Sequence, residues 1–364
     1  MKDITAALSH HPDKPFALER VTLDTPGEGE VLVRMVASGI CHTDLHYRSL
    51  LPPEGGPYVL GHEGTGIVEE TGSGVTGIRP GDRVVLSYRH CGACAQCRAG
   101  RPAYCARLGE LNAPGPRPDG TYTLRQDGKR VTGGFFGQSS FATHVLASAD
   151  NTVVVDADTD LLTAAPLGCG VQTGVGAVLN VLRPEPSSSL VVYGAGAVGC
   201  AALMAARAEE VGTVVAVDPV PGRRELALRL GATAVLDPAS DDIVAAVREL
   251  TGGGASHAFD TSGVPSVIAD AALALGRAGV LVLVGLGKPQ LTVDVDDIMR
   301  CGKTLRGCIE GDARPQEFIP YLLRMRAKGL LPLEEIITTY PFADIDRAVA
   351  DSHSGVTVKP VLVF

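Results

Sequence analysis

The stretch that decides the fold is "SLVVYGAGAVGCAALMAARAEEVGTVVAVD", residues 189–218. Its two apolar runs, separated by a glycine turn and an alanine-rich segment, predict the strand, helix and strand of a parallel α/β domain. Gly194, Gly196 and Gly199 have the spacing G-x-G-x-x-G, which allows a tight turn, close approach of a pyrophosphate and close helix packing. Asp218 follows about 20 residues later, where an acid binds ribose hydroxyls. This combination predicts a dinucleotide site.

The residues around this turn also indicate which dinucleotide binds. Ala197 and Val198 begin the predicted helix, whose free N–H groups and positive dipole end suit a pyrophosphate. The carboxylate of Asp218 would repel a 2′-phosphate, which favours NAD over NADP. Arg223 and Arg224 weaken that preference, because arginine near the ribose can accept the phosphate. A solvated helix start would explain the two arginines equally well.

The pattern on either side of this domain is different. From about residue 20 to 155, short alternating segments between glycine and proline predict small twisted β structure with long loops. After about residue 309 come two helical stretches and a terminal strand, "VTVKPVLVF", in an order that does not extend a doubly wound sheet. We therefore expect an α/β protein of two domains, the first formed by residues 1–170 and 310–364 and the second by residues 171–309.

Composition narrows the classes of partner. The chain has 364 residues, 45% of them hydrophobic, a length that suits two domains. A net charge of −9 without a basic run argues against nucleic acid and anionic membrane surfaces. No apolar run reaches the length of a membrane span, and the N-terminus has no secretory signal pattern. We expect a cytoplasmic protein that acts on a small molecule.

Four cysteines lie close together in "RHCGACAQCRAGRPAYC", residues 89–105: Cys91, Cys94, Cys97 and Cys105. In a reducing compartment this spacing favours thiolate ligands over disulfides, since one Zn²⁺ takes four sulfurs. Chance clustering and a redox Cys-x-x-Cys are the alternatives, although the latter needs only two thiols and a different structural context. A zinc held by four protein ligands leaves no position for substrate, so this site is expected to be structural.

A second set of metal-binding residue types is spread along the chain. Cys41 lies in "GICHTDLHY", His62 in "GHEGTG" and Cys169 in "PLGCGVQTG". Taken singly, Cys169 could be a small buried hydrophobe and His62 a hydrogen-bonded core histidine. Taken together, two thiols and an imidazole suit a catalytic zinc with three protein ligands and one open position.

These motifs resemble those of the zinc-dependent medium-chain alcohol dehydrogenases, over essentially the whole chain. The resemblance rests on "GHEGTG", the four-cysteine loop, "GAGAVG" with Asp218, and the relative positions of Cys41, His62 and Cys169. It implies a GroES-like catalytic domain, with a structural zinc lobe at 89–107, and a Rossmann NAD domain. "FFGQSSFATH", "PLGCGVQTGVGAVLNVLRP" and "GCIEGDARPQEFIPYL" most resemble the aryl-alcohol, or benzyl alcohol, and geraniol dehydrogenases.

The resemblance implies two zinc ions per chain and roles for residues near the catalytic one. Cys41, His62 and Cys169 would ligate this zinc, and Glu63 could coordinate it transiently. Asp44 would orient His62 through the second ring nitrogen, as outer-shell carboxylates do. Thr43 would accept the proton of the substrate hydroxyl.

Other residues would release the proton or bind the cofactor. His46 would pass the proton to solvent, since an imidazole exchanges protons near neutral pH; a solvated histidine on a polar turn is the alternative. Arg223 would approach the adenosine ribose, and Lys359 and His42 the pyrophosphate.

The expected reaction is reversible hydride transfer between a primary aromatic or allylic alcohol and NAD. A thiol-adduct-dependent formaldehyde dehydrogenase, which would need an anion-binding funnel, and a non-catalytic dinucleotide-binding protein are the alternatives. Relatives form dimers or tetramers, which implies a homo-oligomer. The run "VLVLVG" at 280–285 is the expected sheet edge for pairing between subunits.

Overall fold

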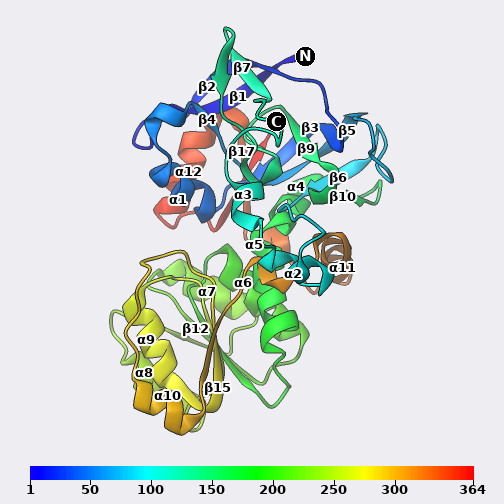
Figure 1. Ribbon diagram of the computed structural model, residues 1–364. Helices are drawn as coiled ribbons and strands as arrows, with labels where there is room; N and C mark the ends of the chain where they lie inside the picture. The colour runs from blue at the N-terminus through cyan, green and yellow to red at the C-terminus, as the bar shows by residue number, and fades with distance from the viewer. The chain divides into compact units, whose positions relative to one another are not determined.

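The computed structural model describes all residues from 1 to 364, and its contacts divide the chain into two compact units (Figure 1). The first unit contains Met1–Cys169, Arg314–Leu323 and Ile337–Phe364; the second contains Gly170–Ala313 and Arg324–Ile336. Residues 310–364 were expected to belong wholly to the first unit. Residues 310–313 and Arg324–Ile336 belong instead to the second, where Arg229 Nε donates to Glu335 Oε2 at 3.3 Å.

The first unit is built on two largely antiparallel sheets. One has the order β4 (Tyr58–Val59), β1 (Lys2–Ser9), β2 (Ala17–Leu23), β7 (Leu124–Gln126), β8 (Lys129–Val131). The other has the order β10 (Thr152–Val155), β6 (Arg83–Leu86), β5 (Glu63–Thr71), β3 (Glu30–Gly39), β18 (Lys359–Val363), β17 (Ile337–Pro341), and β9 (His144–Ser148) also pairs with β3. The terminal strand β18 pairs antiparallel with β3, which brings the end of the chain beside Gly39.

The helices of the first unit are short. They are α1 (His42–Leu50), α2 (Ala95–Arg98), α3 (Leu108–Asn112), α4 (Leu161–Ala164) and α12 (Ile345–His353), while α11 (Pro315–Ala327) runs from the first unit into the second. Helix α1 begins where β3 ends, with Cys41 at its N-cap, and Cys41 N–H donates to Asp44 Oδ2 at 2.9 Å. The Asp44 carboxylate thus stabilises the start of α1, because it accepts a backbone N–H that has no partner within the helix.

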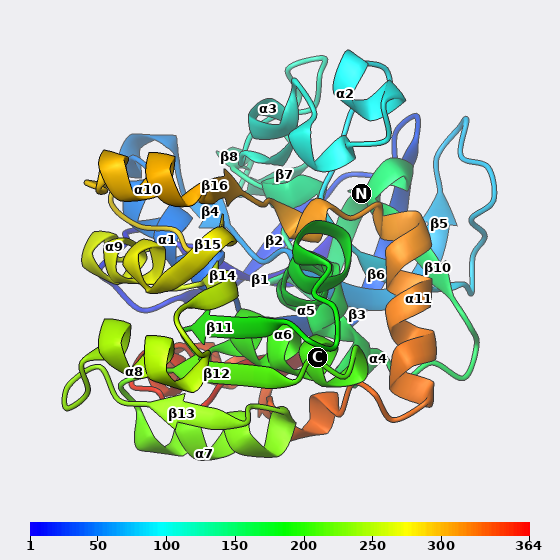
Figure 2. The same ribbon diagram turned by 90° about the horizontal axis from the view of Figure 1, so that it is seen from below.

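The second unit is a six-stranded parallel sheet with helices, as predicted. Its order is β13 (Ala234–Leu236), β12 (Thr213–Val217), β11 (Ser189–Tyr193), β14 (Ala255–Asp260), β15 (Leu275–Leu283), β16 (Thr304–Gly307). Figure 2 shows most of these strands in one layer. The helices are α5 (Gly170–Gly176), α6 (Ala197–Ala208), α7 (Pro221–Leu230), α8 (Ile243–Leu250), α9 (Pro265–Ala274) and α10 (Val295–Cys301).

The order of the strands shows where the nucleotide motif lies in the parallel sheet. The chain first adds strands on one side of β11 and then continues from β14 on the other side, so the order reverses between these two strands. In open parallel sheets, ligands bind at the carboxyl ends of strands at such a reversal. The prediction that 280–285 forms the sheet edge is wrong, because β15 lies between β14 and β16. The edge strands of this sheet are β13 and β16.

No single helix is both long and apolar enough to cross a membrane, although the bent pair Leu161–Gly168 and Gly170–Leu182 meets that requirement by length and composition alone.

Candidate metal centres and nucleotide site

The four-cysteine loop forms one compact sulfur cluster. Cys91, Cys94, Cys97 and Cys105 are free of disulfides, and their sulfur atoms all lie within 4.8 Å of one another. Cys94 is the N-cap of α2, so its sulfur accepts the N–H of Cys97 at 3.5 Å. Cys94 and Cys97 lie at the start of α2 and within it, and Cys105 follows a separate helical turn, Pro102–Tyr104, so that all four side chains converge.

Backbone N–H groups point at these sulfurs. Cys91 N–H donates to the sulfur of Cys105 and Cys94 N–H to that of Cys91, both at 3.3 Å, and Ala106 N–H donates to Cys94 at 3.5 Å. The N–H groups of Ala106 and Cys97 lower the pKa of Cys94 to about 6. Donors that stabilise a thiolate suit four sulfurs that hold a soft, borderline cation, so this loop fits Zn²⁺.

A second cluster lies at the junction of β3, β5 and α1. One ligand atom from each of Cys41, His62, Glu63 and Cys169 lies within 4.8 Å of the others. Cys41 is the N-cap of α1, His62 directly precedes β5, and Cys169 follows the short helical turn Ala165–Gly168. Segments distant in sequence therefore bring together two sulfurs, an imidazole and a carboxylate, all in the first unit.

Asp44 orients the imidazole of this cluster. Its Oδ1 lies 2.7 Å from His62 Nδ1 and also accepts Gly61 N–H at 3.1 Å. Burial alone would lower the pKa of His62, but the Asp44 carboxylate holds it well above its ordinary value. His62 Nε2 is completely buried and has no hydrogen-bond partner. A buried ring nitrogen that has no partner and lies close to two sulfurs is explained by a role as a metal ligand, which binds in place of the proton.

The sulfur of Cys41 suits the same role. A hydrogen bond from Cys169 is the main reason that the pKa of Cys41 lies well below its ordinary value, and His62 and Lys359 add to this shift. Metal ligation requires the thiolate. The residues present therefore fit Zn²⁺, with Cys41, His62 and Cys169 as the predicted ligands.

The position of Lys359 differs from the predicted one, which was beside the pyrophosphate of the cofactor. Its side chain is buried, with 1% of the residue exposed, and its Nζ lies 2.7 and 2.9 Å from the two carboxylate oxygens of Glu63. Nζ also donates to the carbonyl of Ile40 at 3.1 Å. The reason is charge compensation, because Glu63 is fully buried and an isolated carboxylate there would be costly.

Helix α1 carries the residues predicted to handle the proton. Thr43 Oγ1 lies 3.6 Å from Cys41 Sγ, beside the metal cluster. His46 is half-buried one turn further on, its ring edge-on to that of Tyr47 at 6.2 Å. His42 is exposed at the first position of α1. The structure thus brings Thr43 to the cluster and leaves His46 partly exposed one turn further along α1.

Sequence reasoning missed an aromatic group beside His62. The ring of Phe136 lies 4.6 Å from that of His62 at 34°, and the ring of Phe135 lies 5.5 Å away, edge-on. Tyr47 packs on Phe135 at 5.1 Å. Phe136 has φ +50°, an uncommon conformation for a bulky residue. The signal was in "FFGQSS", which the sequence alone marks only as a glycine-flanked pair of aromatics.

The predicted nucleotide turn has the geometry that its glycines imply. Gly194 has φ +93°, and a Cβ on Gly199 would lie 1.9 Å from the carbonyl oxygen of Gly194. A Cβ on Gly196 would meet nothing within 4 Å, so the backbone there is open to a ligand. Helix α6 begins at Ala197, directly after the turn, and its first N–H groups are free for a phosphate.

Asp218 lies at the end of β12 and supports this turn. Its two carboxylate oxygens accept the N–H groups of Ala195 and Val220, each at 2.8 Å. The guanidinium of Arg223 lies 4.0 Å from the same carboxylate, whereas Arg224 binds Asp237 at 2.8 Å. Arg224 also donates to the backbone carbonyl of Asp218 at 2.7 Å, so both arginines contact Asp218, but only Arg223 lies beside its carboxylate.

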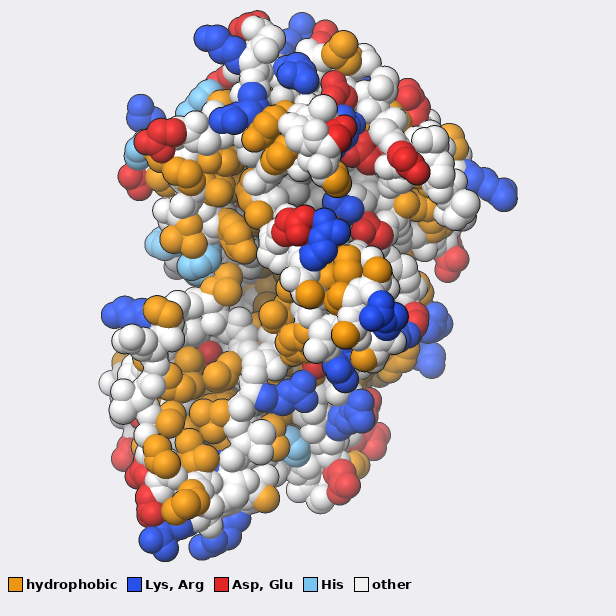
Figure 3. Space-filling model, viewed as in Figure 1, with side chains coloured by type: hydrophobic (Ala, Val, Ile, Leu, Met, Phe, Trp, Pro, Cys, Tyr) orange, Lys and Arg blue, Asp and Glu red, His pale blue; other side chains and the backbone are white.

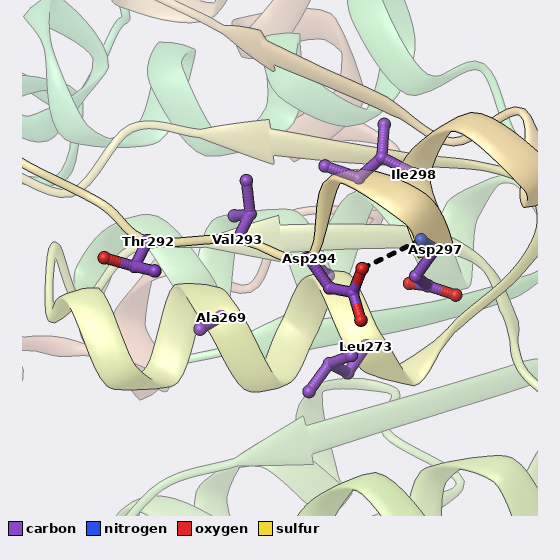
Figure 4. Close-up of a pocket in the computed structure, with 8 residues that line it drawn as sticks. Ala269, Leu273, Thr292, Val293, Asp294, Asp297 and Ile298 are labelled. Atoms are coloured by element: carbon purple, nitrogen blue, oxygen red, sulfur yellow. Dashed lines mark hydrogen bonds between the residues drawn. The ribbon is translucent and has the colours of Figure 1, made fainter.

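A separate hollow of about 360 Å³ lies in the second unit between α9 and the segment that leads into α10. Figure 4 shows Ala269 and Leu273 of α9 on one side and Asp294 and Ile298 on the other. No residue of the glycine turn lines it. Neither the two metal clusters nor the glycine turn therefore lines this hollow.

Known proteins share both parts of this arrangement. A family model described as zinc-binding dehydrogenase matches residues 197–327, and one described as alcohol dehydrogenase GroES-like domain matches residues 27–157. Geraniol dehydrogenase of Castellaniella defragrans is 44% identical over 363 residues, which cover 99% of this chain and 97% of the relative. The crystal structure of benzyl alcohol dehydrogenase from Acinetobacter calcoaceticus matches with a TM-score of 0.96 and 42% identity, over all of both chains.

A more distant relative bears on the alternative activity. S-(hydroxymethyl)glutathione dehydrogenase of Escherichia coli is 32% identical over 366 residues, which cover 99% of both chains. The predicted GroES-like and Rossmann-type domains are confirmed by these matches, as is zinc-dependent alcohol oxidoreduction with a nicotinamide dinucleotide. The chain belongs to the zinc-binding medium-chain alcohol dehydrogenase family.

Proposed function

We propose that this protein is an NAD-dependent dehydrogenase of primary aromatic or allylic alcohols, which it converts reversibly to aldehydes. The observation that carries the proposal is the pair of half-buried aromatic rings near the predicted zinc ligand His62, those of Phe136 and Tyr47, which pack on the fully buried Phe135. Planar π systems gain from offset or edge-on packing against such rings, which small aliphatic alcohols cannot. The names of the geraniol and benzyl alcohol dehydrogenase relatives support the same substrate class.

The side chains of this site divide the chemistry between them. When bound, zinc supplies Lewis-acid polarisation of an alcohol oxygen, and NAD supplies the hydride acceptor. Asp44 holds His62 in one orientation, so that Nε2 faces the cluster. We infer that the Thr43 hydroxyl, which lies beside Cys41, takes the alcohol proton and that His46, one turn away on α1, passes it to solvent. Asp218 directly follows β12, where an acid binds the ribose of the cofactor. Its carboxylate supports a preference for NAD because it would repel the 2′-phosphate of NADP.

The test is NADH production from ethanol, cyclohexanol, benzyl alcohol and geraniol. We expect kcat/KM for benzyl alcohol and geraniol to exceed that for ethanol at least about tenfold, and Phe136→Leu to reduce this advantage by roughly 0.5–1.5 kcal/mol, the worth of an aromatic pair. Equal efficiency across the four alcohols would refute the aromatic or allylic assignment. Formaldehyde oxidation that requires an added low-molecular-weight thiol would favour the alternative activity instead.

We also infer a cytoplasmic homo-oligomer, a dimer or a tetramer. All nine cysteines are free, which suits a reducing compartment. At one edge of the parallel sheet, β16 follows α10, where Val295 and Met299 are 71% and 68% exposed. Figure 3 shows apolar side chains gathered over the region of α9 and α10. Light scattering tests the inference, and a monomeric mass at micromolar concentration would contradict it.

A further inference from the structure

The side-chain amide of Gln138 contacts the backbone on both sides of Glu63. Its Nε2 donates to the carbonyl of His62 at 2.9 Å, and its Oε1 accepts the N–H of Gly64 at 3.0 Å. Nε2 also donates to the carbonyl of Ser87 at 3.2 Å. Gln138 is 2% exposed, so these contacts are made out of reach of bulk water. One planar group therefore binds three backbone positions on two different segments.

These contacts lie where two strands separate. The β5–β6 ladder pairs Ile67 with Arg83 and ends with Thr65 opposite Val85. Continued in the same register, Glu63 would stand opposite Ser87, but no such pair forms in the ladder. The amide of Gln138 lies between the two segments at this point and supplies hydrogen bonds in place of the ladder. The two carbonyls and one N–H at this point require two donors and one acceptor in one plane, which only an amide side chain provides.

Ser87 continues the bridge to the second metal ligand. Its hydroxyl donates to the carbonyl of Gly168 at 2.6 Å, directly before Cys169. Gly168 itself packs closely, because a Cβ there would lie 2.2 Å from the carbonyl oxygen of Leu86. The carbonyl of Ser87 also accepts Asn151 Nδ2 at 3.0 Å, and the same nitrogen donates to the Phe136 carbonyl at 2.8 Å. Asn151 thus also joins Ser87 to the segment that carries Phe136.

We propose that Gln138 and Ser87 are positioning residues that set the separation of His62 and Cys169, and so the geometry and affinity of the metal site. The peptide of His62 is joined through Gln138 to Ser87, and Ser87 is joined to the peptide preceding Cys169. Neither side chain is a predicted ligand, and both are buried. The inference rests on the proposed assignment of Cys41, His62 and Cys169 as zinc ligands.

The test uses Gln138→Met, which keeps the approximate length without donors or acceptor, and Ser87→Ala, which removes one hydroxyl. Thr132→Val is the matched control, because the Thr132 hydroxyl also donates to one carbonyl, that of Gly55 at 2.7 Å, away from the predicted ligands. Each protein is assayed for metal content, for the rate of zinc loss to a chromogenic chelator, for melting temperature, and for the visible spectrum after cobalt substitution.

We expect Gln138→Met to weaken binding of the catalytic-site metal roughly ten- to hundredfold, the usual effect of losing an outer-shell partner, and to shift the cobalt spectrum. Ser87→Ala should act in the same direction, and the double variant should show less than the sum of the two effects, because both act through one bridge. Thr132→Val should lower the melting temperature without altering the spectrum. Zinc loss from the four-cysteine loop should be unchanged in all three.

The outcomes separate this inference from the function on which it rests. If wild-type protein holds two metal ions and both variants lose stability like Thr132→Val, with wild-type metal release and cobalt spectrum, the positioning role is refuted alone. If wild-type protein binds metal only in the four-cysteine loop, the catalytic-zinc assignment fails and the inference fails with it. Should Gln138→Met not fold, Ser87→Ala decides, since it removes a single oxygen.

Discussion

His46 lies three positions after Thr43 on α1, so the two side chains share one face of the helix. His46→Ile should slow alcohol oxidation about tenfold near pH 6–7, less than the loss of a direct general base, because His46 would relay a proton and not touch substrate. At higher pH hydroxide and buffer take the proton directly, so the deficit should shrink. The pH–rate profile checks this under conditions where proton loss or hydride transfer limits turnover.

Two comparisons make the His46 prediction specific. An added small amine base should restore part of the lost rate of His46→Ile if proton transfer limits turnover. His353→Ile, at the exposed end of α12, is the control and should leave the profile as in wild type. A His46→Ile profile that coincides with wild type would mean that His46 is only a solvated histidine on the helix.

Residue types and spacing predicted the members of both metal clusters, because thiolates and imidazole in these patterns have few other uses. They could not predict what compensates Glu63. A lysine in a terminal strand is normally exposed, and only the pairing of β18 with β3 brings Lys359 to the buried carboxylate. The role of Gln138 could not be predicted from the sequence either, because it depends on the point where β5 and β6 separate.

At the scale of elements, the four-cysteine loop contains little regular structure: one four-residue helix and a short helical turn. Cys94→Ser should therefore lower the melting temperature, by roughly 5–15 °C, and reduce zinc to one ion per chain, because structural metal binding is also folding energy. Calorimetry and metal analysis measure both. Cys301→Ser, outside both clusters, is the control. A Cys94→Ser protein with wild-type melting temperature and no turnover would contradict the structural role.

The glycine turn and the end of β12 act together through Asp218. Asp218→Ala should raise the ratio of kcat/KM for NADP over NAD at least about tenfold, because repulsion of a 2′-phosphate disappears while Arg223 remains. Efficiency with NAD should itself fall, since Ala195 N–H loses its acceptor at a cost of about 1–3 kcal/mol. Steady-state kinetics with both cofactors measure these effects.

Arg223 provides the control for the Asp218 prediction. Adding Arg223→Ala to Asp218→Ala should remove the gain with NADP if this guanidinium accepts the phosphate. If Asp218→Ala leaves the cofactor preference unchanged, its carboxylate does not face the ribose and serves only to hold the turn.

Element order was predictable where local patterns are strong and less so at boundaries. The run from 189 to 218 predicted strand, turn, helix and strand, and β11, α6 and β12 occupy it. The apolar run at 280–285 suggested a sheet edge by analogy, yet a continuous apolar strand is typical of a strand covered on both sides and paired at both edges. Arg324–Ile336 joins the second unit through contacts such as Arg229 with Glu335, which no local pattern reveals.

For the whole molecule, the two binding functions lie in different units: the predicted zinc ligands in the first and the glycine turn with Asp218 in the second. Binding of NAD should therefore survive loss of the catalytic metal. Cys169→Ser should reduce zinc toward one ion per chain and abolish turnover, because the cluster loses one of its two sulfurs.

The same variant should still be stabilised by NAD as wild type is, by about 2.7 kcal/mol at a hundred times the dissociation constant. Metal analysis and thermal shifts with and without NAD measure the two properties on one preparation. Gly199→Ala is the reciprocal variant: its Cβ would clash with the Gly194 carbonyl, so NAD stabilisation should be lost while two zinc ions are retained. Turnover by Cys169→Ser at one zinc per chain would exclude Cys169 as a ligand of the catalytic metal, and loss of NAD binding in that variant would show that the two units do not bind independently.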